Sequence, residues 1–224
     1  MNLNKSLEYF NPSDITERIH IIGCGSVGST VVEELARLGL TKFSLYDFDK
    51  VEAKNIANQM FVHSDIGKLK TEAVKERILA INPEANAELI KTFNEGWNGE
   101  RLTGYVFLCV DSIEVRRQIV EKFMGSTQIK AMFDFRTRLE DAQHYAADWS
   151  SPQSKENFLG NMDFSHDEAV DSTPKSACGG VLGVNPTVHA VVSHGVANFV
   201  NFTKGKGLYP IVLVNPFTGM TTVA

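Results

Sequence analysis

A glycine-rich turn and the acid that follows it are the first residues in this chain whose types and spacing suggest chemistry. The turn is Gly23-Cys24-Gly25-Ser26-Val27-Gly28, and Asp47 comes nineteen residues after Gly28. Glycines let the backbone approach a phosphate, a following helix N-terminus stabilises its charge, and the acid can accept hydrogen bonds from ribose hydroxyls. Close packing of a helix on a strand also favours small residues. In this context the motif predicts a nucleotide that contains adenosine, and NAD, FAD and ATP all fit.

Short apolar runs and helical patterns alternate along the chain and must position these residues. Apolar strands are expected at 19–22 and 43–46, on either side of an amphipathic helix that ends at Gly39. Further strands are expected near 87–91, 104–110, 130–135, 142–149 and 210–214, and further helices over 70–81, 112–124 and 181–202. This order predicts an α/β fold: a doubly wound, Rossmann-like, mostly parallel sheet with C-terminal antiparallel strands. The nucleotide should lie at the carboxyl ends of the parallel strands.

The composition indicates one domain, 1–224, with an N-terminal arm at 1–17. The stretch 150–178 is polar for most of its length, rich in Ser, Asn and Asp, and is expected to be a mobile crossover loop that leads to Cys178. A net charge of -5 argues against a large basic surface for nucleic acid. We find no apolar segment of signal-peptide or membrane-spanning length and no C-x-x-C pair, so we expect a cytoplasmic protein with reduced thiols and no structural zinc.

Beyond Asp47 the sequence departs from what a dehydrogenase would show. The ordered series is Asp47-Phe48-Asp49, Asn55-Ile56-Ala57-Asn58-Gln59, Gly67-Lys68-Leu69-Lys70 and, after the expected fourth strand, Val110-Asp111-Ser112. This series resembles the adenylyltransferase domain of the ubiquitin-activating enzyme superfamily, which includes the ThiF-, MoeB- and HesA-type proteins. The resemblance runs from about residue 18 to about residue 221 and rests on the ordered set rather than on any single residue.

The resemblance implies a role for each matching position. Gly23, Gly25 and Gly28 would line the nucleotide phosphates, and Asp47 would bind the ribose. Asp49, Asn55 and Gln59 join the nucleotide-binding set, Lys70 matches the phosphate-binding lysine, and Asp111 matches the acid that holds Mg²⁺. Members of the superfamily join the C-terminal carboxylate of a small ubiquitin-like or sulfur-carrier protein, usually ending in Gly-Gly, to AMP and release pyrophosphate.

The same residues are consistent with that chemistry on physical grounds. A carboxylate that attacks the α-phosphate of ATP meets a strongly negative group, so positive charge is needed where the transition state gathers negative charge. Lys70, Mg²⁺ on Asp111 and the amides of the glycine turn would supply it. No general base is needed, because a carboxylate is already ionised near neutral pH. Taken singly, Lys70 could be a solvated charge and Asp111 a helix N-cap; their joint occurrence with Asn55 and Gln59 favours a triphosphate site.

Cys178 is a second candidate for covalent chemistry. It matches the position of a reactive cysteine in several superfamily members, and a thiol at a helix N-terminus can have a lowered pKa. It could then attack the adenylate and hold the carrier as a thioester. A small buried hydrophobic residue is an equally good interpretation of Cys178. Cys24 and Cys109 are expected to be packing residues.

Two departures from the superfamily concern arginines. Asn58 stands where an arginine is usual, and the N-terminal arm, whose one basic residue is Lys5, lacks the arginine that often reaches a neighbouring subunit's nucleotide. Either an arginine of this chain compensates, or a partner supplies the charge, or ATP turnover is weak. The arginines that could compensate are Arg116, Arg136 and Arg138.

Three functions therefore stay open at the level of sequence. The first is ATP- and Mg²⁺-dependent adenylation of a carrier protein's C-terminus by a homodimer, with or without a thioester at Cys178. The second is an NAD-dependent oxidoreductase, which the segment 23–47 alone would support but which leaves Lys70 and Asp111 unexplained. The third is a scaffold of the same fold that binds a carrier without catalysis, motivated by the two absent arginines.

Overall fold

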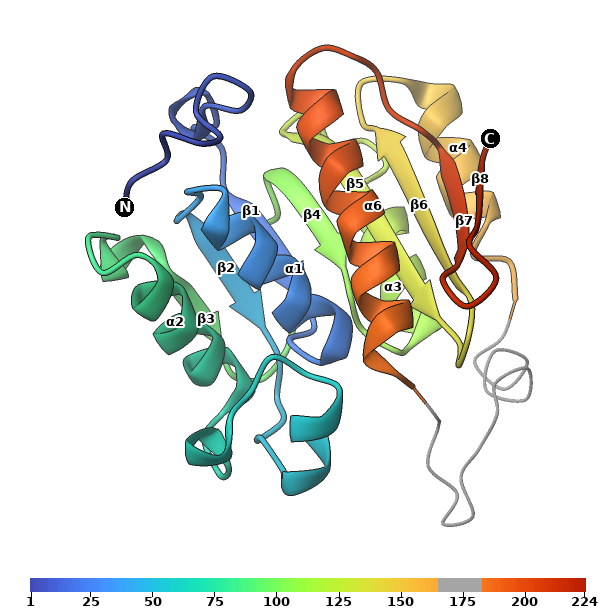
Figure 1. Ribbon diagram of the computed structural model, residues 1–224. Helices are drawn as coiled ribbons and strands as arrows, with labels where there is room; N and C mark the ends of the chain where they lie inside the picture. Colours follow the sequence, from blue (N-terminus) through green and yellow to red (C-terminus); the bar gives the residue numbers. More distant parts are fainter. Residues whose placement is uncertain (165–182) are drawn as a thin grey trace.

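Eight strands form one sheet in the order β3-β2-β1-β4-β5-β6-β7-β8 in the computed structural model, which describes residues 1–164 and 183–224 (Figure 1). The strands are β1 (Ile19–Ile22), β2 (Phe43–Tyr46), β3 (Lys91–Phe93), β4 (Gly104–Leu108), β5 (Ile129–Thr137), β6 (Ala142–Asp148), β7 (Ile211–Asn215) and β8 (Met220–Val223). The pairs from β3 to β5 are parallel and those from β5 to β8 are antiparallel. The predicted α/β fold with a mostly parallel sheet and C-terminal antiparallel strands is confirmed.

The central strand β1 marks the point where the chain reverses direction across the sheet. It pairs with β2 on one side and with β4 on the other, with Ile22 opposite both Tyr46 and Leu108. The chain builds outward from β1 to β2 and β3, and then returns to add β4 and β5 on the opposite side. In open α/β sheets such a switch point leaves a crevice at the carboxyl ends of the two central strands.

Helices cover both faces of the sheet because alternate strand residues are apolar on each side. On one face lie α1 (Ser26–Arg37), α2 (Lys70–Ile81) and α6 (Asn185–Thr203), and on the other α3 (Ile113–Phe123) and α4 (Pro152–Gly160). Phe107, Phe133 and Phe199 pack together in the first core, and Trp149 and Phe158 in the second. No helix within the described ranges is long and apolar enough to cross a bilayer.

Short 3-10 turns connect several of these elements. They are η1 (Pro12–Asp14), η2 (Ala53–Ala57), η3 (His63–Asp65) and η4 (Ala87–Leu89). The strand expected at 87–91 is misplaced, because β3 begins only at Lys91. The preceding residues form η4, which starts where the Asn86 side chain accepts a hydrogen bond from the Glu88 amide at 2.9 Å. The turns η2 and η3 lie in the connection that carries Asn55 and Gln59 towards α2.

The polar segment after β6 also differs from the expected loop. Residues Pro152–Gly160 form α4, which Ser151 caps by accepting a hydrogen bond from the Ser154 amide at 3.3 Å. Ser at the N-cap followed by Pro in the first turn is a recognised helix start, so the sequence held the signal. Residues 165–178 of the expected crossover loop lie outside the described residues.

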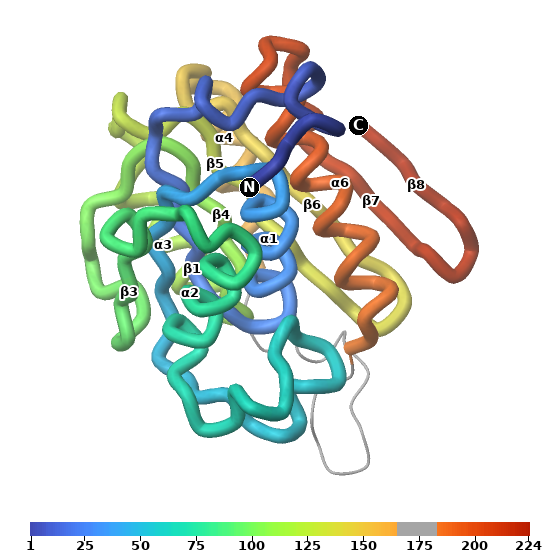
Figure 2. The backbone as a smooth tube through the Cα atoms, turned by 60° about the vertical axis from the view of Figure 1, so that its left-hand side comes forward, coloured from blue at the N-terminus to red at the C-terminus, as the bar shows by residue number. Residues whose placement is uncertain are grey.

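The C-terminal part of the sheet is a hairpin. The helix α6 carries Pro186 in its first turn, as predicted, and leads into β7 and then β8, a strand that the sequence patterns did not predict. Figure 2 shows this hairpin extending from the end of the sheet opposite β3. Gly195 of α6 lies against the sheet, where a Cβ would stand 2.2 Å from Cε1 of the Phe135 ring.

We expect Gly195→Ala to lower the free energy of unfolding by about 1–3 kcal/mol, because the added methyl group overpacks α6 against the buried Phe135 ring. Gly160→Ala is the matched control, since a Cβ there meets nothing within 4 Å at the end of α4, and it should be neutral or slightly stabilising. Urea unfolding of the two variants tests this. Equal stability of Gly195→Ala and the wild type would contradict the packing of α6 on β5.

Candidate functional site

A cavity of about 1060 Å³ lies at the carboxyl ends of the parallel strands, at the switch point beside β1. Its wall includes residues from the glycine turn, from the ends of β2, β4 and β5, and from the starts of α2 and α3. Ligand pockets commonly measure roughly 300–1,000 Å³. The cavity therefore has room for a nucleotide together with part of a second substrate.

The glycines of the turn are required for two different structural reasons. A Cβ on Gly28 would lie 1.9 Å from the Gly23 carbonyl oxygen, and one on Gly23, where φ is 93°, would lie 2.8 Å from the Cys109 oxygen. These two glycines let α1 and β4 approach the end of β1. A Cβ on Gly25 would meet nothing within 4 Å, and Gly25 lines the cavity. Gly25 is therefore the glycine that leaves space for a ligand rather than for the protein itself.

The N-terminus of α1 opens beside that space. Gly25 is its N-cap and offers no side chain to the first turn, so the leading amides are left without an intrahelical acceptor. Donors of this kind, with the helix dipole behind them, favour a phosphate.

Asp47 is oriented by the backbone around it. Its Oδ2 accepts a hydrogen bond from the Cys24 amide at 2.7 Å, and its Oδ1 accepts one from the Asp49 amide at 2.9 Å. Burial raises the pKa of this carboxyl above its usual value, and the two amide hydrogen bonds oppose the rise. Because Asp47 lines the cavity with remaining acceptor capacity, its position suits a ribose hydroxyl.

Lys70 and Asp49 form an ion pair on the same wall. The Lys70 Nζ lies 2.7 Å from Asp49 Oδ2; the lysine side chain is 8% exposed and the aspartate 51%. Two backbone contacts hold the segments together. Lys50 and Leu69 form a short antiparallel bridge, and the Lys70 amide donates to the Asp49 main-chain carbonyl at 3.0 Å. The backbone thus places the start of α2 beside the end of β2.

Asn55 and Gln59 have different places. Asn55 is buried away from the cavity, and its Oδ1 accepts a hydrogen bond from the Glu52 amide at 2.8 Å, which shapes η2. Gln59 lines the cavity, as does Asn58, and its buried Oε1 has no hydrogen-bond partner among the described residues. An unsatisfied buried acceptor is costly unless a ligand or water meets it. Gln59 is therefore directly available to a ligand, whereas Asn55 acts on the shape of the turn.

Asp111 follows β4 and is exposed on the cavity wall. The N-cap of α3 is its neighbour Ser112, whose Oγ accepts a hydrogen bond from the Val115 amide at 3.2 Å. The alternative of Asp111 as N-cap is thus wrong. Within residues 1–164 and 183–224, no hydrogen bond or ion pair engages its carboxylate. Magnesium binds proteins through one or two carboxylates plus substrate phosphates, so the lone Asp111 fits Mg²⁺ held jointly with a triphosphate.

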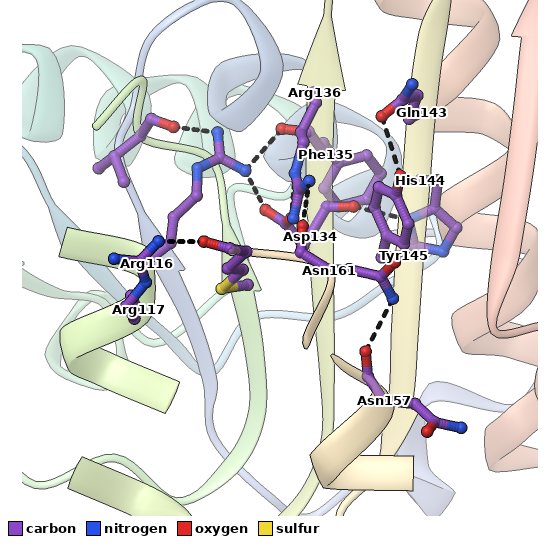
Figure 3. Close-up of polar contacts among 12 residues, drawn as sticks. Arg116, Arg117, Asp134, Phe135, Arg136, Gln143, His144, Tyr145, Asn157 and Asn161 are labelled. Carbon is purple, nitrogen blue, oxygen red and sulfur yellow. Dashed lines mark hydrogen bonds and ion pairs between the residues drawn. The ribbon is translucent and has the colours of Figure 1, made fainter. Parts of the chain in front are cut away.

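Two arginines of the cavity wall, Arg116 and Arg136, contact one buried acid, Asp134 (Figure 3). Arg116 Nη1 donates to Asp134 Oδ1 and to the Phe135 carbonyl, and its Nη2 donates to the Val110 carbonyl. Arg136 Nε donates to Asp134 Oδ2 at 2.8 Å; its Nη2 also lies 2.7 Å from that oxygen, but without hydrogen-bond geometry. Both arginines line the cavity, and Asp134 neutralises one of their two positive charges.

A second set of contacts fixes the segment that follows α4. Arg136 Nη1 donates to the Asn161 carbonyl at 2.7 Å, and Arg117 donates to the carbonyls of Met162 and Phe164. The Arg136 guanidinium also stacks on the Phe164 ring, with 5.1 Å to the centroid. Phe164 thereby becomes part of the cavity wall.

Arg138 differs from the other two arginines. It is 44% exposed, and its Nη2 lies 2.9 Å from the Asp141 carboxylate. A surface pair of this kind contributes little and exchanges partners readily. Of the three arginines, Arg138 is therefore the one most available to an incoming anion.

Asp134 is the residue of this region that sequence reasoning missed as a functional element. The segment Phe133-Asp134-Phe135-Arg136 places an acid inside an otherwise apolar strand, two residues before an arginine. A buried carboxylate needs partners, so that pattern could have indicated the pairing with Arg136 but not the partner from α3. Arg116 comes from a different element and is found only in three dimensions.

The two cysteines in the described part of the chain fit the packing role expected from sequence. Cys24 is fully buried, and burial raises the pKa of both Cys24 and Cys109, so packing is the physical role of these two thiols. Cys178 lies outside the described residues.

Comparison with known proteins shows the family to which this chain belongs. The ThiF family pattern matches residues 15–199, and the chain belongs to this family. The chain is 38% identical over 107 residues to a Haemophilus influenzae protein named tRNA threonylcarbamoyladenosine dehydratase, an alignment that covers 46% of this chain and 41% of that protein. It is 31% identical over 116 residues to ubiquitin-like modifier-activating enzyme 5 of Caenorhabditis briggsae, covering 45% of this chain and 27% of that enzyme. These alignments thus span less than half of either relative.

Solved structures show the same fold at lower identity. A crystal structure of Escherichia coli MccB with ATP has a TM-score of 0.69 at 17% identity and covers 95% of this chain and 64% of that one. A structure of PaaA has a TM-score of 0.68 at 16% identity, with 95% and 65% covered. The Rossmann-like architecture predicted from sequence is therefore shared with these proteins.

Two buried histidines give a pH prediction. The His144 ring stacks on that of Phe133. Its Nε2 faces the Asn198 amide nitrogen at 3.1 Å and its Nδ1 faces the Asp134 carbonyl at 3.2 Å, an arrangement that suits the neutral ring. Burial lowers the pKa of His144 to about 4 and that of His20 to about 3. The unfolded chain, with histidine pKa values of roughly 6.5, binds more protons in this range, so stability falls as pH falls from about 6.5 towards 4.

Unfolding free energies measured between pH 7 and 4 should show this fall. Replacing His144 by Gln should make the slope shallower by up to about 1.4 kcal/mol per pH unit, because one titrating group is lost. His63→Gln, at an exposed position, is the control and should leave the slope almost unchanged. An unaltered slope in His144→Gln would show that its ring is not held neutral.

Proposed function

We propose that this protein transfers the adenylyl group of ATP to a carboxylate of a small protein or peptide. The observation that carries the proposal is the convergence on one cavity at the switch point of the open Gly25 position, Lys70 and Asp111, whose carboxylate has no partner in the described part of the chain. A hydride-transfer site would not require the last two. Membership of the ThiF family and the ATP-bound MccB structure, which has the same fold, support this choice.

The proposed chemistry follows from those positions. A carboxylate oxygen of the acceptor attacks the α-phosphorus, the bond from phosphorus to the oxygen that bridges the α- and β-phosphates breaks, and pyrophosphate leaves with that electron pair. The amides at the start of α1 and the Lys70 ammonium stabilise the negative charge that gathers on the phosphate oxygens. Mg²⁺ held by Asp111 would neutralise further charge on the triphosphate. Asp47 would orient the ribose, and Gln59 Oε1 would accept a hydrogen bond from the ligand.

The absent superfamily arginines are replaced only in part. Asp134 holds Arg116 and Arg136 against the wall, so neither guanidinium is free to follow a phosphate. We infer that Lys70 and the metal carry most of the compensation and that Arg138, paired only with the half-exposed Asp141, adds to it.

The acceptor is proposed by chemistry rather than by name. A ubiquitin-like or sulfur-carrier protein that ends in Gly-Gly offers a free carboxylate on a narrow tail that could enter the cavity, and a homodimer is the assembly that the superfamily resemblance implies. The Haemophilus relative offers a second candidate, a tRNA that carries a threonylcarbamoyl group. Adenylation assays with each acceptor separate the two. The thioester at Cys178 stays a prediction.

Lys70→Ala and Asp111→Ala should each reduce acceptor-dependent exchange between ATP and pyrophosphate by roughly 10²–10³-fold, because the first removes a cation and the second removes the carboxylate that would hold Mg²⁺. Lys68→Ala is the control, since Lys68 pairs with Asp65 and Glu76 outside the cavity wall. Wild-type exchange rates in both site variants would refute the assignment. Stabilisation of the wild type by NAD but not by Mg-ATP in a thermal shift would favour the oxidoreductase, and carrier binding without ATP consumption would favour the scaffold.

Gly25→Ala tests whether the space beside the turn belongs to the ligand. The new Cβ meets no protein atom within 4 Å, so the stability of the free protein should be nearly unchanged. Calorimetric binding of Mg-ATP should weaken at least tenfold, because the methyl group occupies the position of the phosphate. Gly28→Ala, whose Cβ would lie 1.9 Å from a backbone oxygen, should instead lose stability. A Gly25→Ala variant that binds Mg-ATP like the wild type would place the nucleotide elsewhere.

A further inference from the structure

Lys70 occupies a position that costs stability. It is the first residue of α2, where the helix dipole disfavours a cation, and its side chain is only 8% exposed. A buried ammonium needs a partner, and Asp49 supplies it at 2.7 Å. The pairing keeps the Lys70 Nζ on the cavity wall rather than in solvent.

The cavity has few other cations that could take its place. Asp134 holds Arg116 and Arg136, and Arg138 pairs with Asp141. The wall also carries several further carboxylates, namely Asp47, Glu95 and Asp111. Lys70 is therefore one of the few cations of the wall that a phosphate could take over, and it already has an anionic partner.

We propose that Asp49 is a positioning residue that holds the Lys70 ammonium at the cavity wall and gives it up to a nucleotide phosphate when the nucleotide binds. This inference rests on the proposed function, because it requires that Lys70 meets a phosphate. It changes the role expected for Asp49 from sequence: the carboxylate competes with the nucleotide for Lys70 instead of binding the nucleotide.

Removing the Asp49 carboxylate would have two opposing effects on phosphate binding, and the structure indicates which is larger. Removing Asp49 could disorder Lys70, but the Lys70 backbone is held by its amide hydrogen bond to the Asp49 oxygen and by the bridge between Lys50 and Leu69, neither of which needs the carboxylate. The Asp49 side chain is 51% exposed, so the pair itself contributes little stability. In the bound state the carboxylate would face phosphate oxygens of like charge. Loss of competition and repulsion should therefore outweigh loss of positioning.

The test is calorimetric titration of the full chain with Mg-ATP and, separately, with adenosine. Asp49→Asn should bind Mg-ATP about tenfold more tightly than the wild type, whereas adenosine, which lacks phosphate, should bind both proteins equally. Asp49→Glu should restore affinity close to that of the wild type. The gain for Mg-ATP should vanish in the Lys70→Met background, because the effect acts through the lysine. Asp49→Ser serves as a second variant if Asp49→Asn does not fold.

Glu95→Gln is the matched control, because it removes a carboxylate of the same wall that has no ion-pair partner among the described residues. An equal gain in Glu95→Gln would show a general effect of cavity charge and overturn the specific role of Asp49. Unchanged or weaker Mg-ATP binding in Asp49→Asn would also overturn it, and would favour Asp49 as a nucleotide or metal ligand. A wild type that binds neither ligand would instead overturn the proposed nucleotide site, and this inference with it.

Discussion

The close approach of α1 to the end of β1 is the contact on which the rest of the site depends. Gly28 lies against the Gly23 carbonyl with no room for a side chain, and Gly23 lies close to the Cys109 backbone just after β4. This approach brings the N-terminus of α1 to the switch point of the sheet. The Cys24 amide then binds Asp47 and ties the end of β2 to the same place. Helix, central strand and acid are thus one rigid unit.

Charge in the cavity is organised by how deeply each carboxylate is buried. Asp134 is fully buried and pairs with two arginines, which fixes both guanidinium groups at the end of β5 and neutralises one of their two charges. Asp49 and Asp141 are half-exposed, so their partners Lys70 and Arg138 can exchange them for another anion. Asp111 has no partner among the described residues. The site therefore combines charges that are fixed by burial with charges that can exchange partners.

Local sequence signals predicted most of the elements and failed where several signals competed. The helix over 70–81 and the strand at 43–46 were found because their patterns are long or strongly apolar. The strand near 87–91 was misplaced because Asn86 favours a turn, and α4 was missed because its polar composition masked the Ser151 cap and Pro152. β8 is exposed along its length and has no apolar alternation to reveal it. Hydrophobic pattern alone could not resolve these segments.

The sequence by itself determined the family and the fold class, and it predicted a shared site for Gly25, Asp47, Lys70 and Asp111, which line one cavity, since motif spacing records which residues follow which strand. Tertiary structure decided which charges are available. Only packing brings Arg116 from α3 and Arg136 from β5 onto Asp134, and only the contact between the segments at 49–51 and 67–70 sets Asp49 beside Lys70. The reason is physical: ionic interactions depend on distance and burial, and neither is encoded by local order along the chain.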